Sequence, residues 1–245
     1  MKNDPYIVAA FLKAKDRDQW ASADGTNPIV TISRQHGTAG DLIALRTAEI
    51  LTDLSHGQRP WMAIDHTFAQ QVINDHRLPR EVAKFLTEEQ TGSIQDYINA
   101  FWGIGVPAHT IVEKMNQTLL HLAKIGHVVL LGRAAHLATA GFPRAAHVRI
   151  IGSFDRRVER IMAANKGSWD EAAHEIREVD EKRRKFVATY FHADLNDPQG
   201  FDLIFNADRI SAEESAHLIA QLVDSPDFRK KEATHHVELR HLVLG

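Results

Sequence analysis

The chain has 245 residues, of which 44% are hydrophobic and 25% charged, and its formal net charge is −3. This composition is ordinary for a globular protein, and a chain of this length can bury a large core without disulfides or metals. The sequence has no cysteine, which excludes disulfides, thiolate metal sites and cysteine nucleophiles. Its slightly acidic balance argues against a nucleic-acid partner, because proteins that grip a phosphate backbone are usually basic.

The sequence has no run of about 18 apolar residues, which argues against a membrane span. Residues 1–20 mix Lys, Asp and Arg with short apolar pieces, so we expect no secretory signal. We therefore expect a cytoplasmic protein without a membrane partner. Residues 1–27 are interpreted as an N-terminal extension that ends in a turn-rich run.

The first predicted strand follows Pro28, because residues 29–33 are a β-branched, apolar run. A glycine-bearing loop follows at 34–40, and apolar spacing then predicts a helix from Asp41 to about Leu54. A second short strand is expected at 61–65, with the carboxylate of Asp65 at its end. The chain thus opens with strand, loop and helix.

Predicted helices then alternate with buried strands along the rest of the chain. Helical stretches are expected at 66–105, 108–125 and 155–190, and strands at 127–131, 146–151 and 201–206. The helical stretch 155–190 is expected to break near Lys166-Gly167-Ser168. Ser211 and Glu214 fit a capping box at the start of a last helix, and 225–245 form a charged tail.

Apolar strands that alternate with helices predict a parallel sheet covered on both faces, which is a three-layer α/β sandwich. Such sheets bind ligands at the carboxyl ends of their strands. The unusual polar residues of this sequence stand at those ends, in the loop 33–40 and at Asp65, Arg133 and Asn206. The sequence therefore predicts a functional site at this edge.

The loop 33–41 joins a strand to a helix, where backbone N–H groups and a helix N-terminus can bind phosphate. It is not a Walker A motif, because Gly40 takes the place of the lysine and Leu42 that of the Mg²⁺-binding hydroxyl. An ordinary tight turn is the alternative interpretation of this loop.

Arginines provide two further candidate features. Arg133 directly follows a predicted buried strand, where it could clamp a substrate phosphate or pair with a helix carboxylate. Residues 155–185 are the most charged stretch, which is either a solvated helix pair or a mobile lid that brings arginine to transferring phosphates. Asp65 is a candidate for holding a substrate base or sugar or a water bound to Mg²⁺, and a helix cap is the alternative. No metal site is predicted, because the three tail histidines are interpreted as solvated.

Several motifs, in chain order, resemble the cytidylate kinase-like family. Residues 32–40 are similar to its opening I-S-R-[EQ]-[YF]-G-S-G-G, 64–65 to its Y-D, 128–135 to V-I-V-G-R-C-A, 156–161 to the lid entry E-x-R-I-x-R-I, 176–190 to I-x-x-x-D-x-x-R followed by tyrosines, and 201–206 to Y-D-L-x-x-N. The resemblance covers roughly residues 28–223. It implies a P-loop kinase-like domain over 28–224, with a helical lid at about 155–190.

The resemblance also implies an activity, the transfer of the ATP γ-phosphoryl to CMP or dCMP with Mg²⁺. The donor phosphates would be held by the loop residues Arg34, Gly37, Thr38, Ala39, Gly40 and Asp41. The acceptor nucleotide would be held by Asp65, Arg133 and Asp180. Lid charge for catalysis would come from Arg157, Arg160 and Arg183.

A catalytically impaired pseudo-kinase that senses a nucleotide or phosphate is the alternative. The missing Walker lysine and the changed loop favour it, whereas Arg133 and the Asp180-x-x-Arg183 motif favour catalysis. In both cases the expected partner is a nucleotide or another phosphorylated small molecule.

Overall fold

The computed structural model describes residues 27–64 and 108–229, apart from residue 133. Within this part of the chain, five strands form one sheet in the order β2-β3-β1-β4-β5. The strands are β1 (Ile29–Arg34), β2 (Met62–Ile64), β3 (Val128–Leu131), β4 (Ala145–Ile151) and β5 (Leu203–Asn206). Every neighbouring pair is parallel, which confirms the predicted sheet.

β1 lies at the centre of the sheet, with β3 on one side and β4 on the other. Its residue Ile29 is paired with Val128 of β3 and Ala145 of β4. The side chains of Ile29, Val30 and Ile32 are at most 1% exposed. A continuous buried run of this kind is typical of a parallel strand whose two faces are both covered by helices.

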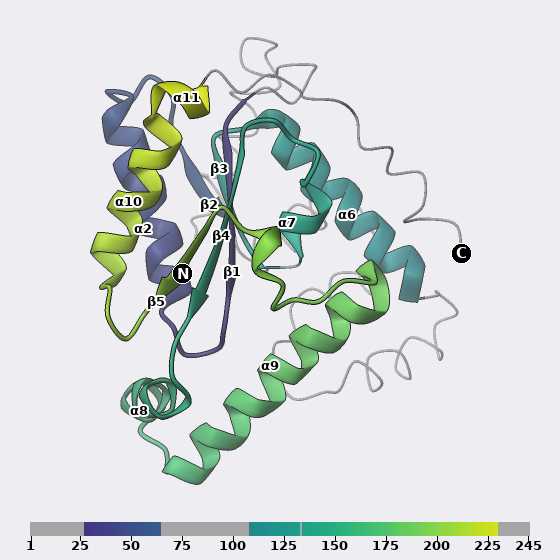
Figure 1. Ribbon diagram of the computed structural model, residues 1–245, viewed down its shortest axis with the longest axis vertical. Coiled ribbons are helices and arrows are strands. Elements are labelled where there is room, and N and C mark those ends of the chain that lie inside the picture. The colour runs from purple at the N-terminus through teal and green to yellow at the C-terminus, as the bar shows by residue number, and fades with distance from the viewer. Residues whose placement is uncertain (1–26, 65–107, 133, 230–245) are drawn as a thin grey trace.

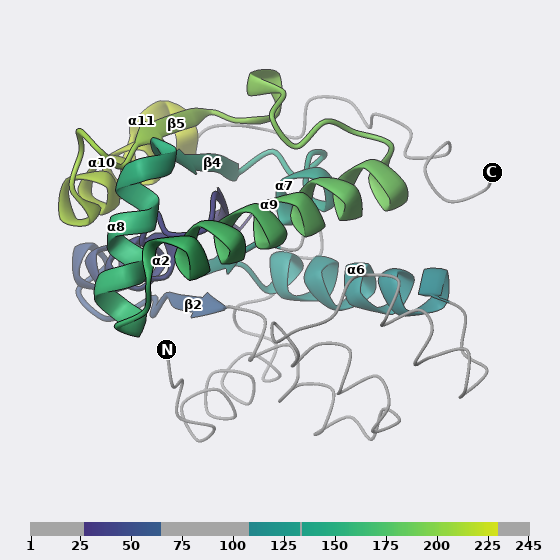
Figure 2. The same ribbon diagram turned by 90° about the horizontal axis from the view of Figure 1, so that it is seen from below.

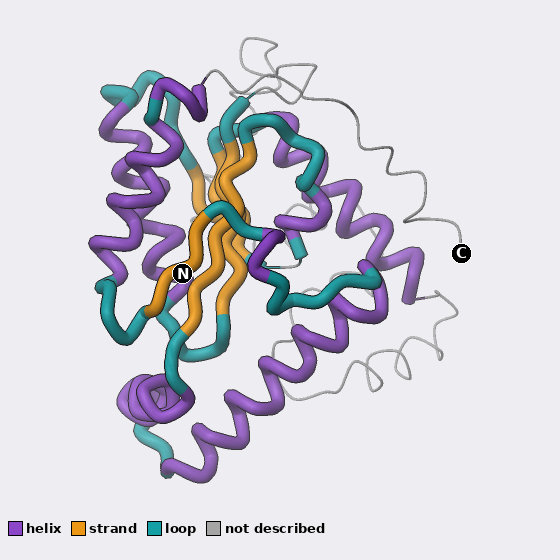
Figure 3. Tube along the Cα trace, viewed as in Figure 1, coloured by secondary structure: helices purple, strands orange, loops and turns teal. Residues whose placement is uncertain are grey.

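Helices cover both faces of the sheet, so that the strands lie between two helical layers (Figures 1 and 3). One layer holds α2 (Gly40–Leu54) and α10 (Ala212–Asp224), followed by the short α11 (Pro226–Arg229). The other layer holds α6 (Ala108–Ile125) and the short α7 (Ala135–Ala138). The predicted three-layer α/β class is therefore confirmed.

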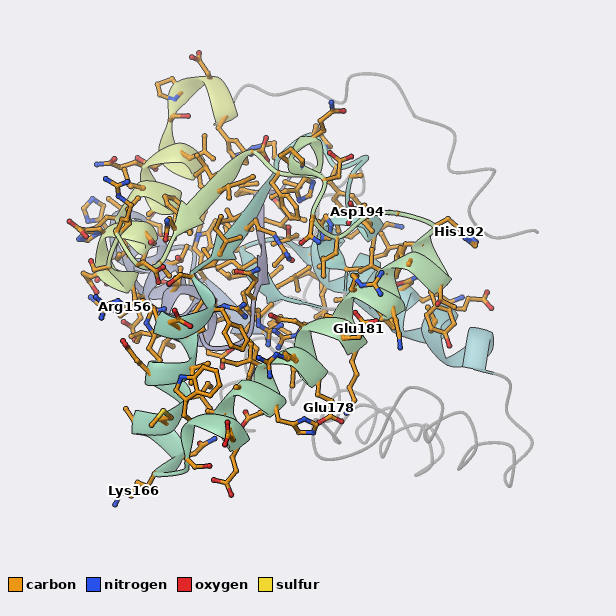
Figure 4. All side chains as sticks on the ribbon, turned by 60° about the horizontal axis from the view of Figure 1, so that its bottom comes forward. Arg156, Lys166, Glu178, Glu181, His192 and Asp194 are labelled. Atoms are coloured by element: carbon orange, nitrogen blue, oxygen red, sulfur yellow. The ribbon has the colours of Figure 1, made fainter. Side chains whose placement is uncertain are left out.

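Two helices lie across the carboxyl edge of the sheet, α8 (Phe154–Asn165) and α9 (Trp169–Phe191), as the view from below shows (Figure 2). α8 ends where Lys166 adopts a left-handed conformation with φ of 55°. Ser168 and Glu171 then form a capping box that starts α9. The turn, marked by Lys166 in Figure 4, coincides with the predicted break. Val158 and Ala173 pack the two helices together in one buried cluster.

Most other predicted elements are found within one or two residues of their expected bounds. The helix 108–125 has the bounds that its pattern predicted, and Ser211 and Glu214 form the predicted capping box of α10. A short 3-10 helix (Pro198–Gly200) precedes β5. The predictions for 1–26, 65–107 and 230–245 lie outside the described residues. Among the described helices, none has the length and apolar content that crossing a membrane requires.

The short helix α7 contains a buried histidine. His136 of α7 is 4% exposed, and its ring stacks on Phe201 with the ring centroids 4.6 Å apart. Burial, together with the nearby His147 and Arg149, lowers the pKa of His136 to about 3. The folded protein therefore holds His136 neutral at a pH where the unfolded chain would protonate it.

This histidine should make stability depend on pH. At pH values between the folded pKa and the unfolded value near 6.5, the unfolded chain binds more protons than the folded protein. The free energy of unfolding is therefore unaffected by the protonation of His136 above pH 6.5 and falls as the pH decreases below that value. The loss should be on the order of 3 kcal/mol between pH 6.5 and pH 4. His136→Phe should reduce this decline, as measured by urea unfolding across that range. His217→Gln, which changes an exposed histidine, is the control, and an equal decline in both variants would contradict the assignment.

Candidate functional site

The loop between β1 and α2 lies at the carboxyl edge of the sheet. Gly37 and Ala39 adopt left-handed conformations, with φ of 79° and 57°. Ala39 is the N-cap residue of α2 and makes no side-chain hydrogen bond to the helix. The first amides of α2 therefore have no side-chain cap, and such a helix start favours an anion.

The three arginines predicted to supply lid charge all meet this loop. Arg157 Nη1 donates to the carbonyl oxygen of His36 at 3.2 Å, and Arg160 Nη1 to that of Gly37 at 3.5 Å. Arg183 Nη1 donates to the carbonyl oxygen of Arg34 at 3.1 Å. The structure thus brings residues from α8 and α9 together on one loop. Their role toward a phosphate stays a prediction.

An ion pair joins α8 to α9 and holds the loop between them. Arg157 Nη1 lies 2.5 Å from Asp180 Oδ2, and Asp180 Oδ1 accepts the backbone N–H of His36 at 2.8 Å. We call Arg157, Asp180 and the backbone of His36 the clamp. A further contact joins the His36 ring to Glu175, with Nε2 2.6 Å from Oε1. The Arg157 side chain is only 7% exposed, so water screens this pair less than a surface pair.

Close packing explains the glycine at position 37. A Cβ added there would lie 3.0 Å from the carbonyl oxygen of Arg157 and 3.2 Å from its Cβ. The backbone of α8 therefore passes directly over the loop. Gln35 adds a second tie, because its Oε1 accepts the N–H of Gly152, just before α8, at 2.9 Å.

Arg34 reaches from the end of β1 to the start of α2. A Cβ on Gly40 would lie 2.8 Å from Arg34 Cγ, and a Cβ on Gly132 would contact Arg34 Nη1. The Nη2 atom of Arg34 lies 3.7 Å from the carboxylate of Asp41 in the first turn of α2. The carboxylate of Asp41, beside the loop, is therefore paired with the guanidinium of Arg34.

Two of the predicted acceptor residues, Asp65 and Arg133, lie outside the described residues. The third, Asp180, lies in the clamp. Thr38 is buried, and its hydroxyl donates to the carbonyl oxygen of Gln35 at 2.8 Å. Both remaining loop positions, Ala39 and Gly40, are at the start of α2.

Sequence reasoning missed some residues that position the site. Asp208, after β5, accepts from Arg160 at 3.2 Å and from the N–H of Ser153 at 2.7 Å. Arg149 of β4 is 4% exposed and donates to Ser33 Oγ at 2.7 Å and Asn196 Oδ1 at 2.9 Å. The sequence signal that could have identified Arg149 was its position as a charged residue inside a mostly apolar strand.

The described groups can bind an anion through amides and guanidinium groups at the edge of the sheet. They do not form a metal centre, since no group of three or more His, Asp or Glu side chains gathers among the described residues. Leu42, in the place of the Walker hydroxyl, is half exposed and offers no oxygen. The described donors are thus of the kind that binds a phosphate.

The model of the cytidylate kinase-like family matches residues 29–209. The chain belongs to this family. The resemblance predicted from the motifs is therefore confirmed. A curated relative, the cytidylate kinase of Pyrobaculum islandicum, is 27% identical over 149 residues, which cover 57% of this chain and 80% of that protein.

One solved structure shares this fold at low sequence identity, and a second resembles it more weakly. An uncharacterized protein from Eubacterium ventriosum has a TM-score of 0.59 and 16% identity, over 81% of this chain and 98% of that one. A shikimate kinase from Bacteroides thetaiotaomicron has a TM-score of 0.48 and 16% identity, over 81% and 99% of the two chains.

The contact between Gly37 and α8 can be tested with a matched pair of substitutions. Gly57 also has a positive φ, of 70°, but a Cβ there would meet nothing within 4 Å. Both Gly37→Ala and Gly57→Ala should lose about 1–2 kcal/mol to backbone strain. Gly37→Ala should lose about 1–3 kcal/mol more, because its methyl group meets the backbone of Arg157. Urea unfolding measures both, and equal losses would contradict the contact.

The clamp should hold α9 on the loop. Asp180→Asn removes the carboxylate beside a nearly buried Arg157, which should cost about 2–3 kcal/mol of stability and speed amide exchange in α8 and α9. Glu159→Gln, which breaks the exposed pair with Arg156, should cost less than about 1 kcal/mol. Hydrogen exchange and urea unfolding measure these effects, and similar values for the two variants would argue against the clamp.

Proposed function

We propose that the protein is a nucleotide-binding phosphotransferase that transfers the γ-phosphoryl group of ATP to CMP, dCMP or a similar acceptor. The observation that carries this proposal is the convergence of Arg157, Arg160 and Arg183 on the glycine-bearing loop. Phosphoryl transfer requires mainly positioning and positive charge, and these groups supply both. Family membership and the cytidylate kinase named among its relatives support the choice of acceptor.

In this proposal, the amides of residues 37–41 bind the donor phosphates, and Arg34 adds a cation near the start of α2. The three lid arginines donate to carbonyl oxygens of the loop, and Arg157 and Arg160 also bind the carboxylates of Asp180 and Asp208. Bonds from guanidinium to phosphate are stronger than bonds to a neutral carbonyl. A bound nucleotide would therefore compete best for the bonds that the arginines make to the loop carbonyls, while the two carboxylates keep Arg157 and Arg160 in place.

The acceptor would lie against Asp65 and Arg133, with Asp180 at the border of the donor loop. Mg²⁺ supplies charge neutralisation in kinases, and nucleotide phosphates provide several of its ligands. The protein's own part in the reaction is then to bind and orient the two nucleotides and to exclude water beneath α8 and α9.

A pseudo-kinase is the second candidate, and one observation favours it. Asp180 already holds the backbone N–H of His36, so an internal carboxylate satisfies one amide of the loop. The absence of a lysine at Gly40 and of a hydroxyl at Leu42 points the same way. In that case the protein would bind a nucleotide or phosphate without transferring it.

The activity is tested by incubating the protein with ATP, Mg²⁺ and a panel of monophosphates, and detecting diphosphates by chromatography. CMP or dCMP should be the preferred acceptor. Arg160→Ala should lower kcat about 10²–10³-fold, because it removes a donor to the transferring group, while CMP binding changes less. Arg156→Ala is the matched control, since Arg156 lies on the same helix and pairs with the exposed Glu159.

Two results would change the conclusion. If CMP binds but no CDP forms, the pseudo-kinase is the correct assignment. If no monophosphate binds at millimolar concentration, the acceptor assignment is wrong.

A further inference from the structure

A cavity of about 600 Å³ lies between the sheet and α9. It is lined by the end of β1, by β4, by the start of α8, by α9 and by Leu195 and Asn196. Residues 37–41 of the glycine-bearing loop do not line it. Arg34, Arg157 and Asp180 belong both to this lining and to the proposed nucleotide site, so a ligand in the cavity would lie beside donor phosphates bound to the amides of 37–41.

The cavity has an excess of positive charge. Its lining includes the five arginines Arg34, Arg149, Arg157, Arg177 and Arg184, and the three acids Glu178, Asp180 and Glu181. Each acid already has a cationic partner. Asp180 pairs with Arg157 at 2.5 Å, Glu181 with Arg184 at 2.6 Å and Glu178 with Lys182 at 2.6 Å. The acids are therefore not available to neutralise the other arginines.

Arg149 and Arg177 are the two cations left over. Within the described part of the chain, neither has a carboxylate within ion-pair distance. Arg149 is nearly buried and donates only to the neutral oxygens of Ser33 and Asn196. Arg177 has its guanidinium carbon 4.8 Å from the centre of the Phe154 ring. Burial lowers the pKa of the Arg149 guanidinium, and Asp180 and Asp194 act against this shift without forming an ion pair with it. A bound anion in direct contact would stabilise the charged form of this nearly buried group.

We infer that this cavity binds a phosphate-bearing small molecule, with Arg149 and Arg177 as its cationic contacts. The site joins β4 to α9, as Arg149 belongs to the strand and Arg177 to the helix. Gln35 and Asn196 add amide groups to its lining, and Phe154 adds an aromatic face. An anion held there would tie α9 to the sheet and so stabilise the clamp.

The test uses inorganic phosphate and pyrophosphate as probes, titrated by calorimetry at constant ionic strength against chloride. Arg177→Gln should weaken binding of both roughly tenfold, and Arg177→Glu should abolish it. Arg177 is exposed on α9, so these variants should fold. Arg156→Gln removes an equal charge from an exposed position outside the cavity (Figure 4) and should leave binding unchanged.

Competition with ADP separates this site from the proposed donor site. Binding of phosphate should survive in the presence of saturating ADP with Mg²⁺, and binding of ADP with Mg²⁺ should survive in Arg177→Gln. Phosphate binding that persists in a protein without kinase activity would support this inference and refute only catalysis. The inference is overturned if phosphate and pyrophosphate do not bind at millimolar concentration, if Arg156→Gln weakens them as much as Arg177→Gln, or if ADP with Mg²⁺ displaces them completely.

Discussion

The arrangement of the carboxyl edge depends on the ion pair between Arg157 and Asp180. This pair holds both backbone polar groups of His36, since Asp180 accepts its N–H and Arg157 donates to its carbonyl oxygen. One loop residue is thereby fixed to α8 and to α9 at once. Because a nearly buried pair requires both partners, the two helices and the loop keep their positions together. Arg160 has a separate anchor, because it also donates to Asp208 and to the carbonyl oxygen of Ala207.

The same pair limits how a ligand can enter. In the proposed donor site, a phosphate on the loop would compete with carbonyl oxygens for the arginines and with the Asp180 carboxylate for an amide. Charge would favour the phosphate over the carbonyl groups, which are neutral, but Arg157 and Arg160 are also bound to the carboxylates of Asp180 and Asp208. The Asp180 carboxylate is itself held in place by Arg157. Asp180 therefore limits both the arginine and the amide that such a phosphate would use.

The sequence predicted those parts of the fold in which local pattern and tertiary packing agree. The strands β1 and β3 are uniformly apolar because both faces of the sheet are covered, and the capping box at Ser211 is a local motif. In those cases a short stretch of sequence carried the information. The glycine-bearing loop and its three arginines were also predicted as members of one site, but from the order of motifs along the chain that resembles the family.

What the sequence could not predict depends on contacts between distant segments. Asp208 lies 48 residues from Arg160 along the chain, yet their side chains meet. Arg149 stands in an apolar strand, and its importance follows only from the cavity that α9 encloses beside it. The pattern of a strand marks such an arginine as unusual but does not identify its neighbours.

The position of Arg34 bears on the missing Walker lysine. In the loop, the place of that lysine is taken by Gly40, and the structure gives a reason for glycine there, since a Cβ would meet the Arg34 side chain. Gly132 has a positive φ of 78°, which favours glycine, and a Cβ there would meet the flexible end of the same Arg34 side chain. Two glycines thus leave room for one arginine from the preceding strand, whose charge reaches the first turn of α2 beside Asp41. The loop therefore keeps a cation near its amides while lacking the lysine, and restoring a lysine at position 40 would displace the cation that is already there.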